Sequence, residues 1–316
     1  MAADVVVVGQ LARDLVLVVD RVPAAGESGR VRQRREMLGG KGANQAVALA
    51  QLGLSPALVA VAGDDHTATW VLDQAHRDDI DVSAVVRRPR TATGLIVDVV
   101  DPDGRWRYLE DLPEPVLLTE ADVLAAERVF ASASWVSVQL QQPPAAALAA
   151  VRLAAPSRAN PSGAKVVLDG APAEGRHQAE LLRGAHVVRA DTREAGLLAG
   201  TRVTGPDDAR RAAAEILRQG PSLVALAVGD SGNYFAWDGG DLLLPLTETP
   251  VADTTGAGDA FTAALISALH AGSPPGHAAR YAVAAAGATV GHPGGRPDLT
   301  TAGINRQLAL LPTGPV

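Results

Sequence analysis

Short apolar runs alternate along this chain with alanine-rich stretches whose apolar residues recur at the period of a helix. This alternation is typical of β-α-β units around a mostly parallel sheet. The apolar runs are nearly uninterrupted, as in strands that helices cover on both faces. We expect central strands at residues 5–8, 57–62, 134–138, 165–169, 185–188 and 223–228.

The stretches between these strands predict helices. Ala43, Ala46, Val47 and Ala50 follow the i, i+3, i+4, i+7 spacing of a single apolar helix face. We expect helices at residues 43–52, 67–78, 143–154, 207–219, 257–271 and 275–290.

Two stretches break this pattern. Residues 14–38 and 93–111 indicate extended or hairpin structure, and the DPDG string at 101–104 is typical of a turn between two strands. Both segments fit a small β flap outside the main sheet.

Composition excludes several classes of protein. With 316 residues the chain has room for two domains, or for one large α/β domain with an insertion. The absence of cysteine excludes disulfides and thiol chemistry, and no pair of histidines has the spacing of a zinc site. The net charge of −7, without a basic block, argues against nucleic-acid binding. A cytoplasmic protein is expected, because the sequence has neither a signal peptide nor an apolar run that could span a membrane.

The string DTTGAGD at residues 253–259 is the strongest local feature. Its glycines allow a tight turn, so the backbone amides of Gly256, Ala257 and Gly258 can converge on an anion at the start of the next helix. Asp259 would lie beside that anion, where a carboxylate can take the proton of a hydroxyl nucleophile. Alternatively, Asp259 only complements the helix dipole.

A second glycine-rich turn, GGKGANQ at residues 39–45, also leads into a helix. It lacks the spacing of a P-loop. Its amides, Lys41 and Asn44 could bind a polyhydroxylated ligand, or the string is simply a tight loop with a solvated lysine.

Two other strings are weaker indications. Gly229-Asp230-Ser231-Gly232 resembles the nucleophile string of a serine protease, but a turn between residues 223–228 and 233–237 fits it better. Residues 256–261 lack one glycine of the dinucleotide-binding fingerprint and lie far from the first strand, which argues against an NAD enzyme.

Together, GGKGANQAVALAQLG (39–53) and DTTGAGDAF (253–261) resemble the two signatures of the ribokinase-like, or PfkB, carbohydrate kinase family. The resemblance covers nearly the whole chain, and residues 9–27 are most similar to the ribokinases. It implies one three-layer α/β/α domain over residues 1–316, with a mostly parallel Rossmann-like sheet and a β lid from residues 14–38 and 93–111. It also implies ATP-dependent phosphorylation of a sugar hydroxymethyl group, most closely that of ribose or a related pentose.

The resemblance assigns roles to individual positions. Asp259 becomes the catalytic base, with the anion hole at Gly256, Ala257 and Gly258. The sugar site comprises Asp14, Gly40, Lys41, Asn44, Gln141 and Asp259. The nucleotide site, which takes ATP with Mg²⁺, comprises Asp191, Glu194, Gly229, Asp230, Ser231, Gly232 and Gly258.

Family members often hold potassium, and in several relatives the lid forms a dimer contact. A homodimer through the lid is therefore expected, with a small-molecule substrate and neither nucleic acid nor membrane as partner. The positions that correspond to the potassium site are Asp253, Thr255, Thr289, His292, Gly294 and Asp298.

The departures from the family pattern concern the substrate more than the reaction. Ribokinases typically have Asn at the position of Ala12 and Glu at that of Gln141, so two sugar contacts are lost or weakened here. Asp191 replaces the Asn of the Asn-x-x-Glu motif, and Pro113-Glu114-Pro115 replaces the Gly-Ala-Asn that usually follows the flap. A nucleoside kinase of the same fold and a non-catalytic sugar-binding regulatory protein stay open as alternatives.

Overall fold

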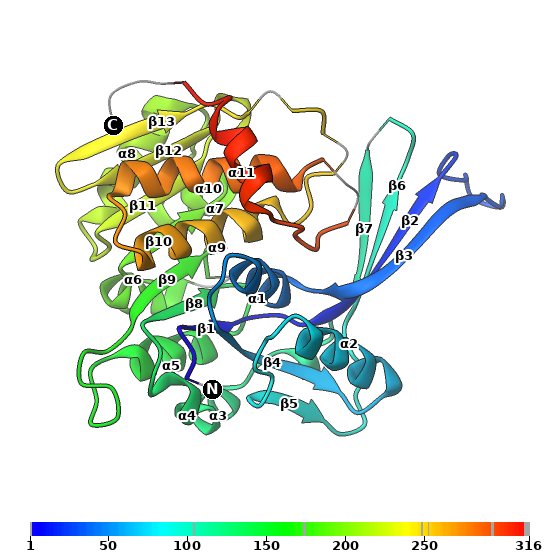
Figure 1. The fold of residues 1–316 in the computed structure, drawn as a ribbon, viewed down its shortest axis with the longest axis horizontal. Helices are drawn as coiled ribbons and strands as arrows, with labels where there is room; N and C mark the ends of the chain where they lie inside the picture. Colours follow the sequence, from blue (N-terminus) through cyan, green and yellow to red (C-terminus); the bar gives the residue numbers. More distant parts are fainter. Residues whose placement is uncertain are drawn as a thin grey trace.

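The computed structural model describes residues 2–103, 105–172, 175–247, 249–251, 253–291 and 294–312. Within these residues a nine-stranded sheet lies between two layers of helices, and a separate four-stranded sheet projects from one end (Figure 1). The predicted three-layer α/β/α core with a β lid is therefore confirmed. No helix in the described part of the chain is long and apolar enough to cross a membrane.

The core sheet has the strand order β13-β12-β11-β10-β9-β8-β1-β4-β5. All its pairs from β11 to β5 are parallel, and β12 and β13 add antiparallel pairs at one edge. Its strands are β1 (Val5–Val8), β4 (Pro56–Gly63), β5 (Val85–Arg88), β8 (Trp135–Gln139), β9 (Lys165–Asp169), β10 (Val187–Ala190), β11 (Leu223–Ala227), β12 (Asn233–Trp237) and β13 (Gly240–Leu244).

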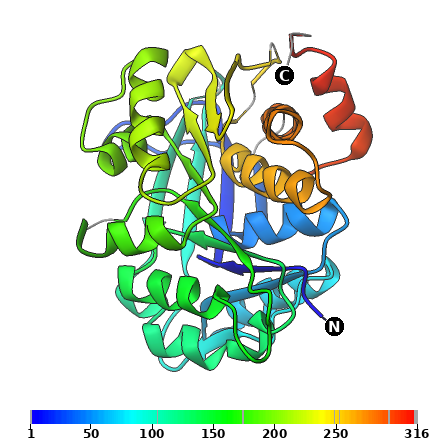
Figure 2. The same ribbon diagram turned by 90° about the vertical axis from the view of Figure 1, so that its left-hand side faces the viewer.

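Helices cover both faces of this sheet, as Figure 2 shows from the side. One layer contains α3 (Glu120–Ala125), α4 (Glu127–Phe130), α5 (Pro144–Ala154), α6 (Gln178–Gly184), α7 (Thr192–Ala199) and α8 (Pro206–Leu217). The other contains α1 (Lys41–Gln51), α2 (His66–Arg77), α9 (Ala257–His270), α10 (Pro275–Thr289) and α11 (Thr301–Leu308). Three short 3-10 helices are η1 (Glu114–Val116), η2 (Gly175–His177) and η3 (Gly229–Ser231).

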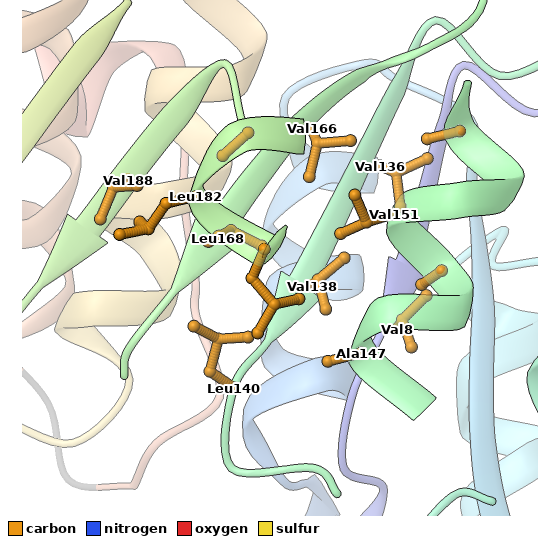
Figure 3. Packing of buried hydrophobic residues seen from close by; sticks show 14 of the residues in the cluster. Val8, Val136, Val138, Leu140, Ala147, Val151, Val166, Leu168, Leu182 and Val188 are labelled. Carbon is orange, nitrogen blue, oxygen red and sulfur yellow. The ribbon is translucent and has the colours of Figure 1, made fainter. Parts of the chain in front are cut away.

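Small side chains allow these layers to pack closely. In Figure 3, Ala147 and Val151 of α5 lie over Val136 and Val138 of β8. Because an alanine-rich helix brings its backbone close to the sheet, the continuous valine runs of the strands are fully buried on both faces. The core thus holds the carboxyl ends of its strands rigidly in place.

The second sheet has the order β3-β2-β6-β7 and is formed by β2 (Ala12–Val19), β3 (Val31–Gly39), β6 (Leu95–Val100) and β7 (Trp106–Asp111). These strands come from the two segments that interrupt the β-α-β alternation. In Figure 1 they project together to the right of the core. We call this sheet the lid.

The expected strands differ from the observed ones by one residue at most, except for one that is shifted by two residues. Residues 185–188 were expected to form a strand, whereas β10 spans Val187–Ala190. Ala185, the C-cap residue of α6, donates its backbone N–H to Leu182 O at 3.2 Å, so the first residue of the expected strand belongs to the end of the helix. Apolar character alone does not distinguish a buried helix end from a buried strand.

The strand order places a topological switch point at β1. Within the core sheet, β4 and β5 lie on one side of β1. The later strands β8, β9, β10 and β11 follow one another on its other side. In open α/β sheets, ligands bind in the crevice outside the carboxyl ends of the strands at such a point.

Candidate active site

A cleft of about 350 Å³ opens at the carboxyl edge of the core sheet, beside the lid. It is lined by the loops after β1 and β8, the carboxyl ends of β9 and β10, the amino ends of α1, α7 and α9, and the inner side of the lid. The cleft brings together many of the residues that the sequence predicted: Asp14, Gly40, Lys41, Asn44, Gln141, Asp191, Glu194, Thr255, Gly256, Gly258 and Asp259.

The turn before α9 has the tight geometry that its glycines predict. Gly256 caps the helix in the left-handed region, with φ of 74°. A Cβ at Gly256 would lie 1.8 Å from the carbonyl oxygen of Gly295, so the turn is also packed against the loop near the carboxyl end. Gly256 and Gly258 line the cleft, whereas Ala257 does not. The amino end of α9 therefore faces the cleft with its positive dipole end.

Asp259, the predicted base, lies in the first turn of α9 and is 6% exposed. Its Oδ1 accepts a hydrogen bond from Gln45 Nε2 at 3.3 Å, and its Oδ2 accepts one from Asn44 Nδ2 at 3.4 Å. Burial and the nearby charge of Asp169 raise its pKa to about 7, against the opposing effects of Lys41, Gln45 and Arg189. A carboxylate with such a pKa is suited to accept a proton near neutral pH.

Asp14, on lid strand β2, also lines the cleft. Its carboxylate rests directly over Gly39, where a Cβ would lie 1.9 Å from Asp14 Cγ. Burial, and then the charges of Asp259 and Asp98, raise the pKa of Asp14 to about 7, although a hydrogen bond from the Gly40 backbone opposes them. Asp14, Lys41 and Asn44 thus form a polar wall that can bind the hydroxyls of a ligand.

Gln141 completes this wall on the β8 side. Its Oε1 accepts a hydrogen bond from Gln139 Nε2 at 3.1 Å, and Gln139 in turn accepts one from the backbone N–H of Gln10 at 3.0 Å. Ala12 is fully buried and has no side-chain polar atom to offer. The polar side chains of Gln139 and Gln141 on this side of the cleft are neutral amides.

The lid contacts the core directly across the cleft. The hydroxyl of Tyr108 on β7 hydrogen-bonds to Thr255 Oγ1. Because Thr255 donates its own hydroxyl proton to Asp253 Oδ1 at 2.6 Å, Tyr108 is the donor in that contact. The ring of Trp106 stacks on Tyr108 with centroids 4.5 Å apart, and both residues line the cleft with Ile96 and Glu110. The lid is therefore in a closed position.

Asp191 and Glu194 form a capping box at the amino end of α7. Asp191 Oδ1 accepts from Glu194 N at 2.7 Å, and Glu194 Oε2 accepts from Asp191 N at 2.8 Å. Both residues also line the cleft. The capping box therefore explains this acidic pair structurally, and it leaves one oxygen of each carboxylate outside these two bonds.

Gly229, Asp230, Ser231 and Gly232 form and follow the 3-10 helix η3 at the end of β11. They lie at the same carboxyl edge as α7, since Thr192 Oγ1 donates to Ala227 O at 2.9 Å. They do not line the cleft itself.

Of the predicted potassium positions, Thr255 and Gly294 contact Asp253 directly. Asp253 is buried, and it accepts hydrogen bonds from the backbone of Thr255 and Gly294, each at 2.8 Å. Thr289 is buried with its hydroxyl on Ala285 O, whereas Asp298 is exposed. His292 lies outside the described residues.

Asp98 of the lid is a buried acid near Asp253. Burial and the charge of Asp253 raise its pKa to about 7. Neither oxygen of its carboxylate has a hydrogen-bond partner among the described residues. In the described part of the chain, no three His, Cys, Asp or Glu side chains are grouped so as to hold a metal ion by themselves.

Two charged residues of the site were not predicted from the sequence. Asp169 and Arg189 lie opposite each other at the ends of β9 and β10, and Arg189 Nη1 is 3.1 Å from Asp169 Oδ1. Both line the cleft. A signal was available, because a charged residue at the carboxyl end of a buried parallel strand points to the ligand edge of the sheet.

Gln45 links these charges to the predicted base. It is fully buried, and its Nε2 donates to Asp169 Oδ2 at 2.6 Å as well as to Asp259. Its Oε1 accepts from Ser137 Oγ at 2.7 Å, which fixes the orientation of the amide. The sequence included Gln45 in the glycine-rich string but assigned it no role.

The chain matches the pfkB family of carbohydrate kinases over residues 2–302. A ribokinase from Staphylococcus aureus is 29% identical over 271 residues, which cover 85% of this chain and 87% of the relative. A 1-phosphofructokinase from Rhodobacter capsulatus is 32% identical over 263 residues, 81% of this chain and 80% of the relative.

The fold is also similar to that of a solved ribokinase structure. The crystal structure of a ribokinase from Thermotoga maritima superposes with a TM-score of 0.80 at 25% identity, covering 97% of this chain and 99% of that protein.

Proposed function

Because the chain belongs to the pfkB family of carbohydrate kinases, which are ATP-dependent sugar kinases, we propose that it transfers the γ-phosphoryl group of ATP to the hydroxymethyl group of ribose or a related pentose. The observation that carries this proposal is the buried Asp259 at the amino end of α9, with its pKa raised to about 7.

The proposed reaction is an in-line displacement. Asp259 accepts the hydroxyl proton of the sugar, and the sugar oxygen forms a bond to the γ-phosphorus. The bond from that phosphorus to the β,γ-bridging oxygen breaks, and ADP leaves with the electron pair. The amides of the Gly256–Gly258 turn hold the transferring group, and the closed lid excludes water that would compete with the sugar.

Mg²⁺ would accompany the nucleotide in this proposal and neutralise its phosphate charge. Asp191 and Glu194 fit such an ion, because both line the cleft and each has a carboxylate oxygen that the capping box does not use. They would hold it through water, since Mg²⁺ keeps several waters when bound with phosphates. Gly229–Gly232 would lie along the nucleotide beyond α7.

Potassium is a second proposed cofactor. The buried carboxylate oxygens of Asp98 without a hydrogen-bond partner, close to Asp253, support a cation there. Backbone carbonyls near Thr255, Thr289 and Gly294 would complete the donors, and the exposed Asp298 would contribute through its backbone.

The relatives differ in their acceptor, since one is a ribokinase and another is a 1-phosphofructokinase. Ala12 offers no side-chain hydrogen bond and Gln141 offers only a neutral one, so both weaken the binding of ribose. Other residues of the predicted sugar site can still bind a pentose: Asp14, Gly40, Lys41 and Asn44. A nucleoside is the second candidate acceptor, because the stacked rings of Trp106 and Tyr108 could bind a base.

We also propose a homodimer that forms through the lid. Leu109 is 66% exposed and Val31 is 42% exposed on its strands, so the lid presents apolar side chains to solvent. The use of ATP fits the cytoplasmic location that the sequence predicts.

An acceptor screen tests the proposed function. ADP release is measured with Mg²⁺ and ATP against pentoses, hexoses, phosphorylated sugars and nucleosides, with and without K⁺. We expect the highest kcat/KM with ribose or another pentose and an increase with K⁺. Preference for adenosine or inosine would favour the nucleoside kinase, and sugar binding by calorimetry without ADP release would favour the regulatory protein. Removal of Mg²⁺ with EDTA should abolish turnover.

A further inference from the structure

Arg189 is a cationic side chain at the cleft to which the family comparison assigns no role. Its position is set by the β9–β10 pairing, in which Arg189 lies opposite Asp169. The side chain of Arg189 is 20% exposed and that of Asp169 only 4%, so the arginine is the member of the pair that reaches the cleft surface. Burial alone would lower the pKa of Arg189, but Asp169 and Glu194 raise it overall, so the guanidinium stays charged.

The guanidinium lies against the first turn of α9. A Cβ built on Gly258 would lie 2.7 Å from Arg189 Nη2 and 3.2 Å from its Cζ. The Arg189 Cζ is also 6.0 Å from the centroid of the Phe261 ring on the same helix. These contacts place the cation next to the backbone amides that would form the anion hole.

The position of the Arg189 guanidinium beside the amino end of α9 is electrostatically unusual. The amino end of a helix carries partial positive charge, so a cation there is unfavourable unless an anion accompanies it. Asp169, Glu194 and Asp259 all supply negative charge near the guanidinium. Of these three carboxylates, Asp169 alone hydrogen-bonds to it in the described part of the chain, and the second oxygen of Asp169 already accepts from Gln45 at 2.6 Å. A guanidinium has five N–H donors, of which Asp169 takes one through Nη1. An anion bound between Arg189 and the start of α9 would satisfy both positive groups.

We propose that Arg189 is a catalytic residue whose guanidinium binds the transferring phosphoryl group together with the amides at the amino end of α9, and that Asp169 is the positioning residue that holds it there. The inference rests on the proposed kinase function. In the reaction given above, Arg189 stays protonated throughout. It neutralises charge on the phosphoryl oxygens while the new oxygen–phosphorus bond forms and the bond to ADP breaks.

Arg189→Ala tests this role, with Arg189→Lys as the conservative variant. We expect Arg189→Ala to lower kcat at least about a hundredfold, the effect of removing one preorganised donor, with Arg189→Lys in between. The affinity for ADP, measured by calorimetry, should change less than about threefold, because ADP lacks the transferred group. Guanidinium chloride at millimolar concentration should restore part of the lost kcat of Arg189→Ala, whereas the same concentration of NaCl should not.

Arg88→Ala is the matched control. Arg88 pairs with Asp122 at 2.6 Å outside the cleft, with side chains 26% and 12% exposed, so it is a similar ion pair without access to the substrate. It should lower the melting temperature without a guanidinium-dependent change in kcat.

Two outcomes would overturn the proposal in different ways. If the wild type releases ADP and Arg189→Ala keeps kcat within about threefold, or shows a loss that guanidinium does not restore, Arg189 has no direct role while the kinase function stands. If the wild type releases no ADP with any acceptor, the proposed function itself is wrong, and the role of Arg189 is wrong with it.

Discussion

Asp259 illustrates how single residues set the chemistry of this site. Its neighbours push its pKa in opposite directions: burial and Asp169 raise it, whereas Lys41, Gln45 and Arg189 lower it. An aspartate whose pKa is about 7 is half ionised near pH 7 and mostly ionised only at higher pH. If it is the base, kcat/KM for the sugar should rise with pH through about 7 and then level off.

Asp169→Asn tests this balance. Removing the negative charge of Asp169 should lower the pKa of Asp259, so the acidic limb of kcat/KM should move to lower pH. Lys41→Gln removes a positive charge and should move the limb to higher pH. The measurement is kcat/KM for the sugar from pH 5 to 9. Acidic limbs of kcat/KM that stay in place, or that move in the opposite directions, would contradict the proposed causes of the raised pKa of Asp259.

Gly256 is a residue at which both conformation and space require glycine. Gly256→Ala should destabilise the protein by the cost of a left-handed residue, roughly 1–2 kcal/mol, and by its clash with Gly295 O. Gly272→Ala is the matched control, since Gly272 has φ of 79° and no atom within 4 Å of its added Cβ. Urea unfolding should show the larger loss for Gly256→Ala, and equal losses would argue against a tightly packed turn.

The glycine-rich turns could be predicted from the sequence because their spacing has a direct backbone meaning. Arg189 and Asp169 were missed because each ends an apolar run and looks locally like a solvated strand end. Their significance depends on the parallel pairing that brings them together. Pairing partners far apart in the chain cannot be read from a single segment.

Among the elements, the lid depends most on contacts made by individual side chains. Its strands were predicted as extended segments, and Asp14 was the one side chain on them that was assigned to the site. Tyr108 and Asp98 face inward because of the strand pairing, and both reach the turn around Asp253. The short helices α3, α4, α6, α7 and α11 were not predicted, because segments of 4 to 8 residues carry little periodic signal.

Tyr108→Phe tests whether the lid contact contributes to substrate binding. The change removes the hydrogen bond to Thr255 and keeps the ring. A hydrogen bond contributes about 0.5–1.5 kcal/mol, so KM for the sugar should rise between about two- and tenfold, with a smaller change in kcat. Steady-state kinetics with a saturating concentration of ATP gives both constants. An unchanged KM would mean that the contact does not help to hold the lid over the sugar.

At the scale of the whole molecule, the site is a consequence of topology. The parallel order β11-β10-β9-β8-β1-β4 places the loops of distant segments at one edge, and the cleft forms there. The sequence could therefore predict the fold, the general position of the cleft and many of its residues. It could not place residues 229–232, the proposed nucleotide loop, relative to the cleft, because their position depends on how α7 packs beside them.

The central claim is that Asp259 deprotonates the acceptor hydroxyl. The most direct test compares ADP release by the wild type and by Asp259→Asn on the best acceptor as a function of pH. We predict a wild-type acidic limb near pH 7 and a variant whose kcat is lower by a factor of about 10² to 10⁴, with sugar binding retained by calorimetry. An Asn variant that turns over within tenfold of the wild type would contradict it.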